Sequence, residues 1–214
     1  MMAVPVKKIL RALRYRLVDG PRGFGKPVAE AVADAEYREG HWDHFFHWDE
    51  LPRHLVLAGA IAHFCPQPSV LDLGCGSGRL ADIFRVHPRT RYVGVDFSAE
   101  GLARARALDL EGIEWVQADY SAWQPDGQFD AIVFNESLGY ARDVAALLQG
   151  FAPRLSGRGR FFVSHFRFGH HAAVWRRVDT VCETLAGTTV MSAEGRRAWD
   201  IRVLKPRKAG AVNV

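Results

Sequence analysis

The chain has 214 residues, 48% of them hydrophobic and 24% charged, which is the balance of a globular domain with a full core. Its three cysteines lie far apart without metal-ligand spacing, which favours reduced thiols in a cytoplasmic protein over a disulfide framework. No apolar run is long enough to span a membrane, and the N-terminal stretch lacks the apolar run and cleavage site of a signal peptide.

The basic character of the chain is concentrated at its N-terminus. Residues 1–26 hold seven lysines and arginines against one aspartate, a net charge of +6, whereas the whole chain carries +4. Their apolar residues recur at helical spacing between the basic ones: Ile9, Leu10, Leu13 and Leu17. We interpret this segment as a helix that packs on the domain and leaves its basic face in water. The alternative is a weak contact of residues 5–18 with an acidic surface, such as an anionic membrane or a nucleic acid.

Residues 36–48, EYREGHWDHFFHW, are rich in aromatic side chains and histidines. We expect residues 1–50 to form a basic arm and an aromatic lid segment, ahead of a domain formed by residues 51–214. We interpret the aromatic residues of the lid segment as core residues, with a platform for the acceptor as the alternative: Trp42, Phe45, Phe46 and Trp48. His41, His44 and His47 suggest a metal cluster, but no carboxylate–histidine set shows convincing ligand spacing, so no metal is predicted.

From residue 51 onward, the apolar patterns of helices and strands alternate along the chain. The predicted helices cover residues 51–64, 79–87, 98–108, 141–155 and 170–185. The predicted strands cover residues 69–73, 91–96, 113–119, 129–136, 159–166, 188–192 and 198–206, with the last two as an antiparallel pair. This alternation predicts an α/β fold with a doubly wound sheet that is buried on both faces by helices.

The stretch LDLGCGSGRL, residues 71–80, places three glycines between the first strand and the following helix. Backbone N–H groups at such a turn suit a polar or anionic ligand, and open α/β sheets bind nucleotides there. Dinucleotide sites need G-x-G-x-x-G, whereas this turn has G-x-G-x-G followed by Arg79. Asp96 and Asp119 end the second and third strands, where carboxylates suit a ribose diol and the exocyclic amine of adenine.

Four segments together resemble the class I S-adenosylmethionine-dependent methyltransferases, of the small-molecule type, over roughly residues 51–166: VLDLGCGSGRL, YVGVDFS, VQADYSAW and FDAIVFNESLGYARD. The resemblance implies a seven-stranded, mostly parallel, Rossmann-like sheet whose last strand is antiparallel, and S-adenosylmethionine as the cofactor. It implies that Asp96 binds the ribose hydroxyls and that Asp119 binds the adenine amino group, near the backbone N–H of Tyr120. The residues expected to bind the cofactor are Asp72, Gly74, Cys75, Gly76, Gly78, Asp96, Phe97, Asp119, Tyr120 and Asn135.

The acceptor of the methyl group is expected beyond the carboxyl ends of the fourth and fifth strands. His165 is the first candidate for a catalytic base because imidazole titrates near neutral pH; the alternative is a histidine that only ends a strand. Glu136 is the second candidate, or else a cap for the following helix, and Tyr140 is the third.

Three hypotheses of function follow from these residues. The leading one is transfer of a methyl group to an oxygen or nitrogen of a small molecule, such as a metabolite, a natural product or a glycan precursor. The second is a methyltransferase that docks on nucleic acid or on an anionic membrane through the basic arm. The third is a non-catalytic partner protein with a cofactor fold. A nucleic-acid substrate is not expected, because NESL replaces the Asn/Asp-Pro-Pro-aromatic element of base-methylating enzymes after the fourth strand.

Overall fold

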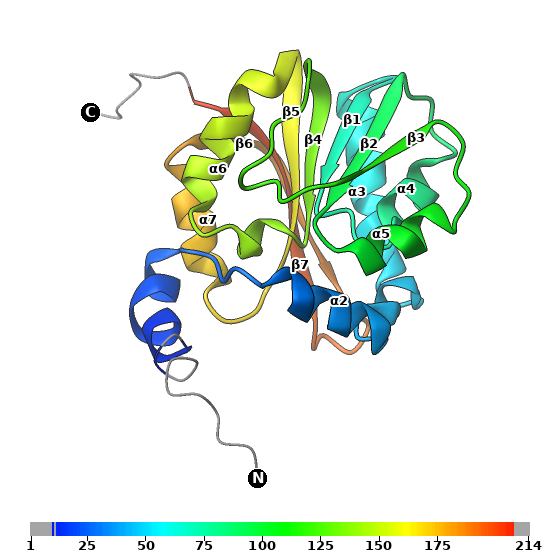
Figure 1. The fold of residues 1–214 in the computed structure, drawn as a ribbon. Helices are drawn as coiled ribbons and strands as arrows, with labels where there is room; N and C mark the ends of the chain where they lie inside the picture. The colour runs from blue at the N-terminus through cyan, green and yellow to red at the C-terminus, as the bar shows by residue number, and fades with distance from the viewer. Residues whose placement is uncertain (1–9, 11, 208–214) are drawn as a thin grey trace.

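A computed structural model describes residue 10 and residues 12–207. Seven strands form one sheet in the order β3-β2-β1-β4-β5-β7-β6 (Figure 1). Neighbouring strands among the first five are parallel, and β7 is antiparallel to both of its neighbours. The predicted fold class is confirmed. The strands are β1 (Ser69–Leu73), β2 (Arg91–Asp96), β3 (Ile113–Gln117), β4 (Phe129–Asn135), β5 (Leu155–Phe166), β6 (Cys182–Met191) and β7 (Ala198–Pro206).

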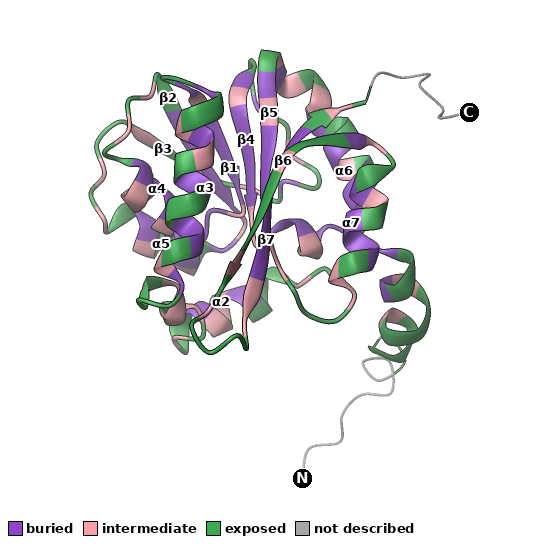
Figure 2. Ribbon diagram, turned by 180° about the vertical axis from the view of Figure 1, so that it is seen from behind, coloured by how far each residue is buried: buried purple, intermediate pink, exposed green. Residues whose placement is uncertain are grey.

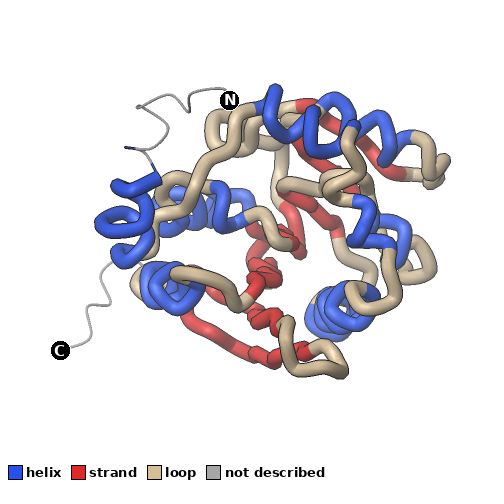
Figure 3. Tube along the Cα trace, turned by 90° about the horizontal axis from the view of Figure 1, so that it is seen from below, coloured by secondary structure: helices blue, strands red, loops and turns tan. Residues whose placement is uncertain are grey.

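Helices cover both faces of this sheet (Figure 3). On one face, α3 and α4 enclose a core that includes Ile61, Phe84 and Phe162. On the other face, α6 and α7 enclose a second core that includes Phe151 and Trp175. The helices are α2 (Glu30–Arg38), α3 (Leu51–Phe64), α4 (Arg79–Phe84), α5 (Ala99–Arg106), α6 (Val144–Phe151) and α7 (His171–Asp179). Because the central strands are covered on both sides, nearly all of their residues are buried (Figure 2).

Local signals account for several helix boundaries. The Ser98 Oγ accepts a hydrogen bond from the Gly101 N–H, so Ser98 caps the start of α5, as its sequence position predicts. Asp143 caps α6 in the same way, because its Oδ1 accepts from two backbone N–H groups of the first turn. The predicted helix over 141–155 therefore begins later, at Val144, and β5 already starts at Leu155.

The predicted helix over 170–185 is wrong in its last third. Helix α7 ends at Asp179, and Cys182 begins β6. Val178, Val181 and Leu185 have helical spacing, and this local pattern misled the prediction. The segment is a strand because β7 lies between β5 and β6 and offers β6 a full antiparallel edge, from Cys182 opposite Pro206 to Met191 opposite Ala198. Long-range pairing thus overrides local periodicity here.

The described part of the basic arm is helical, but its apolar face does not pack on the domain. Leu10, Leu13 and Leu17 are 60%, 47% and 69% exposed, so the interpretation of a helix packed through these residues is wrong. A π-helical turn, Tyr15–Asp19, and a 3₁₀ turn, Gly20–Arg22, continue the segment toward α7. Ile9, Lys7, Lys8 and Arg11 lie outside the described residues. Among the described helices, none has both the length and the apolarity needed to cross a bilayer.

Candidate active site

The glycine turn after β1 requires glycine for two physical reasons. Gly74, Gly76 and Gly78 have φ angles of +77°, +54° and +78°, in the left-handed region that side chains disfavour. A Cβ at Gly74 would also collide with the Ser137 side chain, and one at Gly76 would collide with the hydroxyl of Tyr37. The turn is therefore packed tightly against this chain's own residues, among them Tyr37 of α2.

Asp96 connects the end of β2 to the glycine turn. Its Oδ2 accepts a hydrogen bond from the Gly76 N–H at 2.9 Å, and its Oδ1 accepts from the Ser98 N–H at 2.8 Å. Burial raises the pKa of this carboxyl, although the N–H groups of Ser98, Gly76 and Phe97 oppose that shift. These N–H groups do not use all the lone pairs of the carboxylate, so Asp96 can still accept a hydrogen bond from a ligand.

Three adjoining cavities open around the carboxyl ends of the strands. The central cavity includes Tyr37, Trp42, Gly74, Asp96 and Asn135 in its wall. The Asp119 cavity includes Pro27, Phe97, Asp119, Tyr120 and Arg142. The His165 cavity, of about 360 Å³, includes Tyr15, Lys26, Phe45, His165, Arg197 and Trp199. Tyr140 lies in the wall of all three, so the cavities adjoin one another.

The residues predicted to bind the cofactor divide into two groups. Six of them line the central or the Asp119 cavity: Gly74, Asp96, Phe97, Asp119, Tyr120 and Asn135. The other four lie outside both walls: Asp72, Cys75, Gly76 and Gly78. The Cys75 thiol packs toward Gly94 of β2, in agreement with a space-filling role.

Asp72 has a buried carboxyl group, and only one of its two oxygens has a hydrogen-bond partner among the described residues. The Tyr92 hydroxyl donates to its Oδ2 at 2.8 Å, whereas its Oδ1 has no partner among the described residues. Burial raises the pKa of Asp72 to about 7, with the Tyr92 hydrogen bond opposing and the charge of Asp96 adding to the shift. Protonation of Asp72 is therefore coupled to folding.

Asp72→Asn is expected to flatten the pH dependence of stability. The folded pKa is about 7 and the reference value is 3.8, so the folded state binds more protons between these values. In the wild type, the contribution of Asp72 to the free energy of unfolding is fully present below about pH 4. It is lost as the pH rises through 7. Urea unfolding at several pH values should show a smaller loss of unfolding free energy for Asp72→Asn than for wild type. The same substitution at exposed Asp126 is the control, and equal slopes for all three proteins would contradict the expectation.

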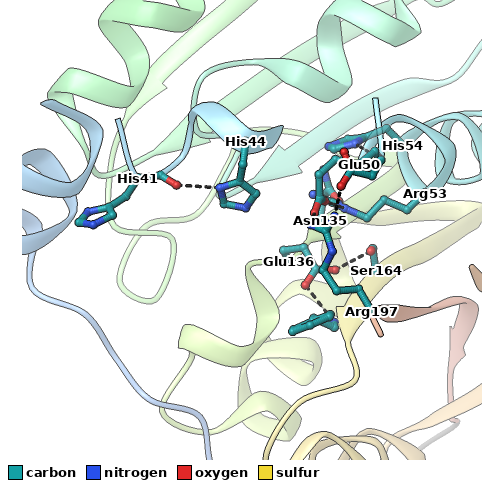
Figure 4. Close-up of polar contacts among 11 residues, drawn as sticks. His41, His44, Glu50, Arg53, His54, Asn135, Glu136, Ser164 and Arg197 are labelled. Atoms are coloured by element: carbon teal, nitrogen blue, oxygen red, sulfur yellow. Dashed lines mark hydrogen bonds and ion pairs between the residues drawn. The ribbon is translucent and has the colours of Figure 1, made fainter. Parts of the chain in front are cut away.

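A buried ion pair between Arg53 and Glu50 contacts Asn135, which lines the central cavity (Figure 4). Arg53 is 1% exposed; its Nε donates to Glu50 at 2.5 Å and its Nη1 donates to the Asn135 Oδ1 at 2.7 Å. The guanidinium also lies over the rings of Phe45 and Trp199, at 5.0 and 5.7 Å. Its Nη2 has no partner among the described residues. The sequence offered one signal for Arg53: it occupies the same helix face as the buried Leu57 and Ile61, where an unpaired cation would be costly.

All three candidate catalytic residues meet at the His165 cavity: His165, Glu136 and Tyr140. Burial lowers the pKa of His165, and the nearby carboxylate of Glu136 opposes this shift, so the imidazole is neutral at pH 7 and can accept a proton. Burial raises the pKa of Tyr140 to about 12, which keeps its hydroxyl protonated. By its protonation state, His165 is better suited than Tyr140 to act as a base.

Glu136 is bound to the strand that carries His165. Its Oε1 accepts from the Ser164 hydroxyl at 2.6 Å and its Oε2 accepts from the Phe166 N–H at 2.9 Å (Figure 4). These partners flank His165 on both sides. Glu136 itself has a φ of +61°, a strained conformation for a non-glycine residue that clusters at functional sites. Its carboxylate therefore holds the end of β5 and does not cap the following helix.

The lid segment contributes walls of the site, and the core interpretation of its aromatic residues is wrong. Trp42 and Phe45 line both the central and the His165 cavities, whereas Phe46 and Trp48 are exposed. The Trp42 Nε1 is buried without a partner in the described part of the chain. The His44 Nδ1 lies 2.7 Å from the His41 carbonyl oxygen, and the described residues contain no group of three or more histidine, cysteine, aspartate or glutamate side chains that could hold a metal ion.

Comparisons with known proteins place this chain in a family. A family model described as a methyltransferase domain matches residues 34–195. The trans-aconitate 2-methyltransferase of Azoarcus sp. strain BH72 is 44% identical over 142 residues, which cover 64% of this chain and 56% of that protein. The enzyme of the same name from Escherichia coli O7:K1 is 34% identical over 91 residues, 42% of this chain and 36% of that protein. This chain thus spans about half or less of the length of these relatives.

Among solved structures, the N-methyltransferase NodS of Bradyrhizobium japonicum WM9, in complex with S-adenosyl-L-homocysteine, has the same fold. Its TM-score is 0.70 at 16% identity, over 83% of this chain and 98% of that chain. The chain therefore belongs to the methyltransferase domain family. Membership of this family agrees with the predicted enzyme class, a methyltransferase with S-adenosylmethionine as its cofactor.

The polar groups of the site fit this cofactor. Asp96 and Asp119 each lie in a cavity wall, where the predicted contacts with the ribose hydroxyls and the adenine amino group would be made. Trp42 lines the central cavity, and Arg53 reaches its wall through the hydrogen bond to Asn135. The rings of Trp42, Phe45 and Tyr140 suit a neighbouring cation. When bound, S-adenosylmethionine supplies a methyl carbon activated by the sulfonium for in-line displacement.

Asp96→Ala is expected to weaken binding of S-adenosylhomocysteine by about 1.5–3 kcal/mol, because it removes a charged acceptor from the ribose hydroxyls. It also frees the Gly76 N–H, which now depends on Asp96. Calorimetric titration measures the loss, with Asp126→Ala as the exposed control. NAD should not bind the wild-type protein. Unchanged affinity in a folded Asp96→Ala variant would show that this carboxylate does not contact the cofactor.

Proposed function

We propose that this methyltransferase transfers the methyl group to an oxygen or nitrogen of a small molecule that binds in the His165 cavity. The observation that carries the proposal is the direct contact between the two compartments. The central and His165 cavities share four wall residues: Trp42, Phe45, Glu136 and Tyr140. An acceptor in the His165 cavity would therefore face the methyl-donor side of the site.

The side chains around this cavity can orient a small acceptor and exclude water. Aromatic rings form much of its wall, including Phe166, Phe168 and Trp199. His165 would accept a proton from an acceptor hydroxyl or amine, while Glu136 fixes the strand end that presents the imidazole. The wall residues would also align the acceptor with the transferable methyl group.

Charged groups allow an acidic acceptor as well. Lys26 and Arg197 lie in the wall, and Arg197 is paired with Asp49 and with Glu50, the latter at 3.0 Å. The names of the Azoarcus and Escherichia coli relatives make a carboxylic acid one of the acceptors to examine. Because Glu50 and Glu136 share the cavity, its charge is balanced, and phenols and amines remain equal candidates.

The proposal is tested by offering isotopically labelled S-adenosylmethionine together with separate acceptor panels. The panels contain carboxylic acids including trans-aconitate, phenols and primary amines, and mass spectrometry detects labelled methyl products. Asp96→Ala is the control that should lower every rate. Methyl transfer to RNA or to protein, with no transfer to any small molecule, would contradict the proposal.

A further inference from the structure

The N-terminal helix presents an apolar face to solvent. Leu10, Leu13 and Leu17 are exposed, and Val18 is 40% exposed beside them. In Figure 2 this helix stands out from the body and is coloured almost wholly as exposed. A row of leucines in water is unfavourable, which indicates that another surface covers it.

The same segment carries the positive charge of the protein. Arg14 and Arg16 are exposed on the helix, and the sequence adds Lys7, Lys8 and Arg11 around the leucines. Residues 1–26 carry +6, so the rest of the chain is slightly acidic. A nucleic acid would match the charges but leave the leucines unburied, and an apolar protein groove would not account for so many cations. An anionic lipid surface satisfies both features, since leucines enter the acyl boundary while basic side chains contact the headgroups.

We propose that the N-terminal helical segment, described at residue 10 and residues 12–19, docks this methyltransferase on anionic lipid, with Leu10, Leu13 and Leu17 as the inserted residues. The inference concerns the leucine face of this helix and does not depend on the identity of the acceptor.

The helix is fixed to the body at its C-terminal end, which leaves the leucine face free. Gly20 is buried so closely against His170 that a Cβ there would collide with the ring, and the Tyr15 ring stands edge-on to His170 at 5.8 Å. Beyond it, the Arg177 guanidinium lies 4.1 Å from the centre of the Phe24 ring. Because Tyr15 also lines the His165 cavity, docking would place one wall of that cavity beside the lipid.

Flotation of the 214-residue protein with vesicles tests the proposal. Vesicles of phosphatidylcholine alone are compared with vesicles of equal parts phosphatidylcholine and phosphatidylglycerol. The protein should float with the anionic vesicles at low salt, and the bound fraction should fall as salt shortens the Debye length from about 10 Å at 0.1 M to about 3 Å at 1 M. Equal binding to both vesicles, or none to either, would overturn the proposal.

Two matched triple variants identify the inserted face. The combined changes Leu10→Ala, Leu13→Ala and Leu17→Ala keep the helix propensity and should lower anionic-vesicle partitioning by about tenfold or more. The control combines Leu55→Ala, Val86→Ala and Leu185→Ala, which remove exposed apolar side chains elsewhere, and should float like wild type. Both variants should bind S-adenosylhomocysteine like wild type, which shows that they are folded.

Two further outcomes would also overturn the proposal. The first is sedimentation of the wild type as a dimer that the leucine changes convert to a monomer, without binding to vesicles. The second is retention of an oligonucleotide at salt concentrations where vesicles are ignored. Arg14→Gln with Arg16→Gln should weaken vesicle binding and reduce its salt dependence, and no effect of this charge change would count against the lipid surface.

Discussion

His165→Ala is expected to lower kcat by about 10²–10⁴-fold for an acceptor that must lose a proton, such as a phenol or an amine. The imidazole lies in the His165 cavity, on the acceptor side of Tyr140, and its lowered pKa keeps it unprotonated at neutral pH. Affinity for S-adenosylhomocysteine should be unchanged, because His165 does not line the central or the Asp119 cavity. Single-turnover rates at saturating cofactor measure the effect.

The size of the loss also reports the chemistry of the acceptor. A carboxylic acid is already ionised at neutral pH, so its methylation needs no base and should survive His165→Ala within a few-fold. For a phenol or an amine, the wild-type rate should persist to pH values below the ordinary histidine pKa of about 6.5 and fall only when the imidazole becomes protonated. A folded His165→Ala protein with wild-type turnover on a phenol or amine would transfer the role of base to Glu136 and, after it, to Tyr140.

Arg53→Met is expected to lower the free energy of unfolding by about 3 kcal/mol. Removing one member of a buried ion pair costs about 3–5 kcal/mol, because the remaining charge stays buried without compensation. The lower end applies here, since Glu50 keeps its contact with Arg197 at 3.0 Å. The Asn135 carbonyl also loses its donor, and the rings of Phe45 and Trp199 lose their cation. Urea unfolding monitored by circular dichroism measures the change.

The chain contains a matched control for this prediction. Arg91 and Glu114 form an ion pair of similar length, 2.9 Å, but both side chains are about half exposed. Arg91→Met should therefore cost less than about 1 kcal/mol. Adding Glu50→Gln to Arg53→Met should recover part of the lost stability, because the unpaired buried charge is then removed. Equal losses for Arg53→Met and Arg91→Met would show that burial does not set the strength of the Arg53 pair.

Local sequence signals predicted the elements that carry the glycine turn. The predicted bounds of β1, β2 and β7 match the structure. For β1 and β2, the signal is a short, mostly apolar run bounded by turn residues. The acids and the histidine at the strand ends could be predicted because parallel strands bring their carboxyl ends to one edge of the sheet. Local patterns could not predict the features that depend on partners far away in the sequence. Tyr37 reaches the site because α2 packs on α5, and β6 is a strand because β7 pairs with it.

Tyr140 has a consequence for the order of events in catalysis. Tyr140 lies in the wall of all three cavities, so a shift of this residue when one cavity is filled would reshape the other two. Cofactor and acceptor affinities are then thermodynamically linked: the factor by which the first ligand changes the affinity of the second equals the reverse factor. The spent cofactor keeps the adenosyl group and would therefore still contact Tyr140. Its departure and that of the methylated acceptor would therefore be coupled, and turnover would be sensitive to product accumulation.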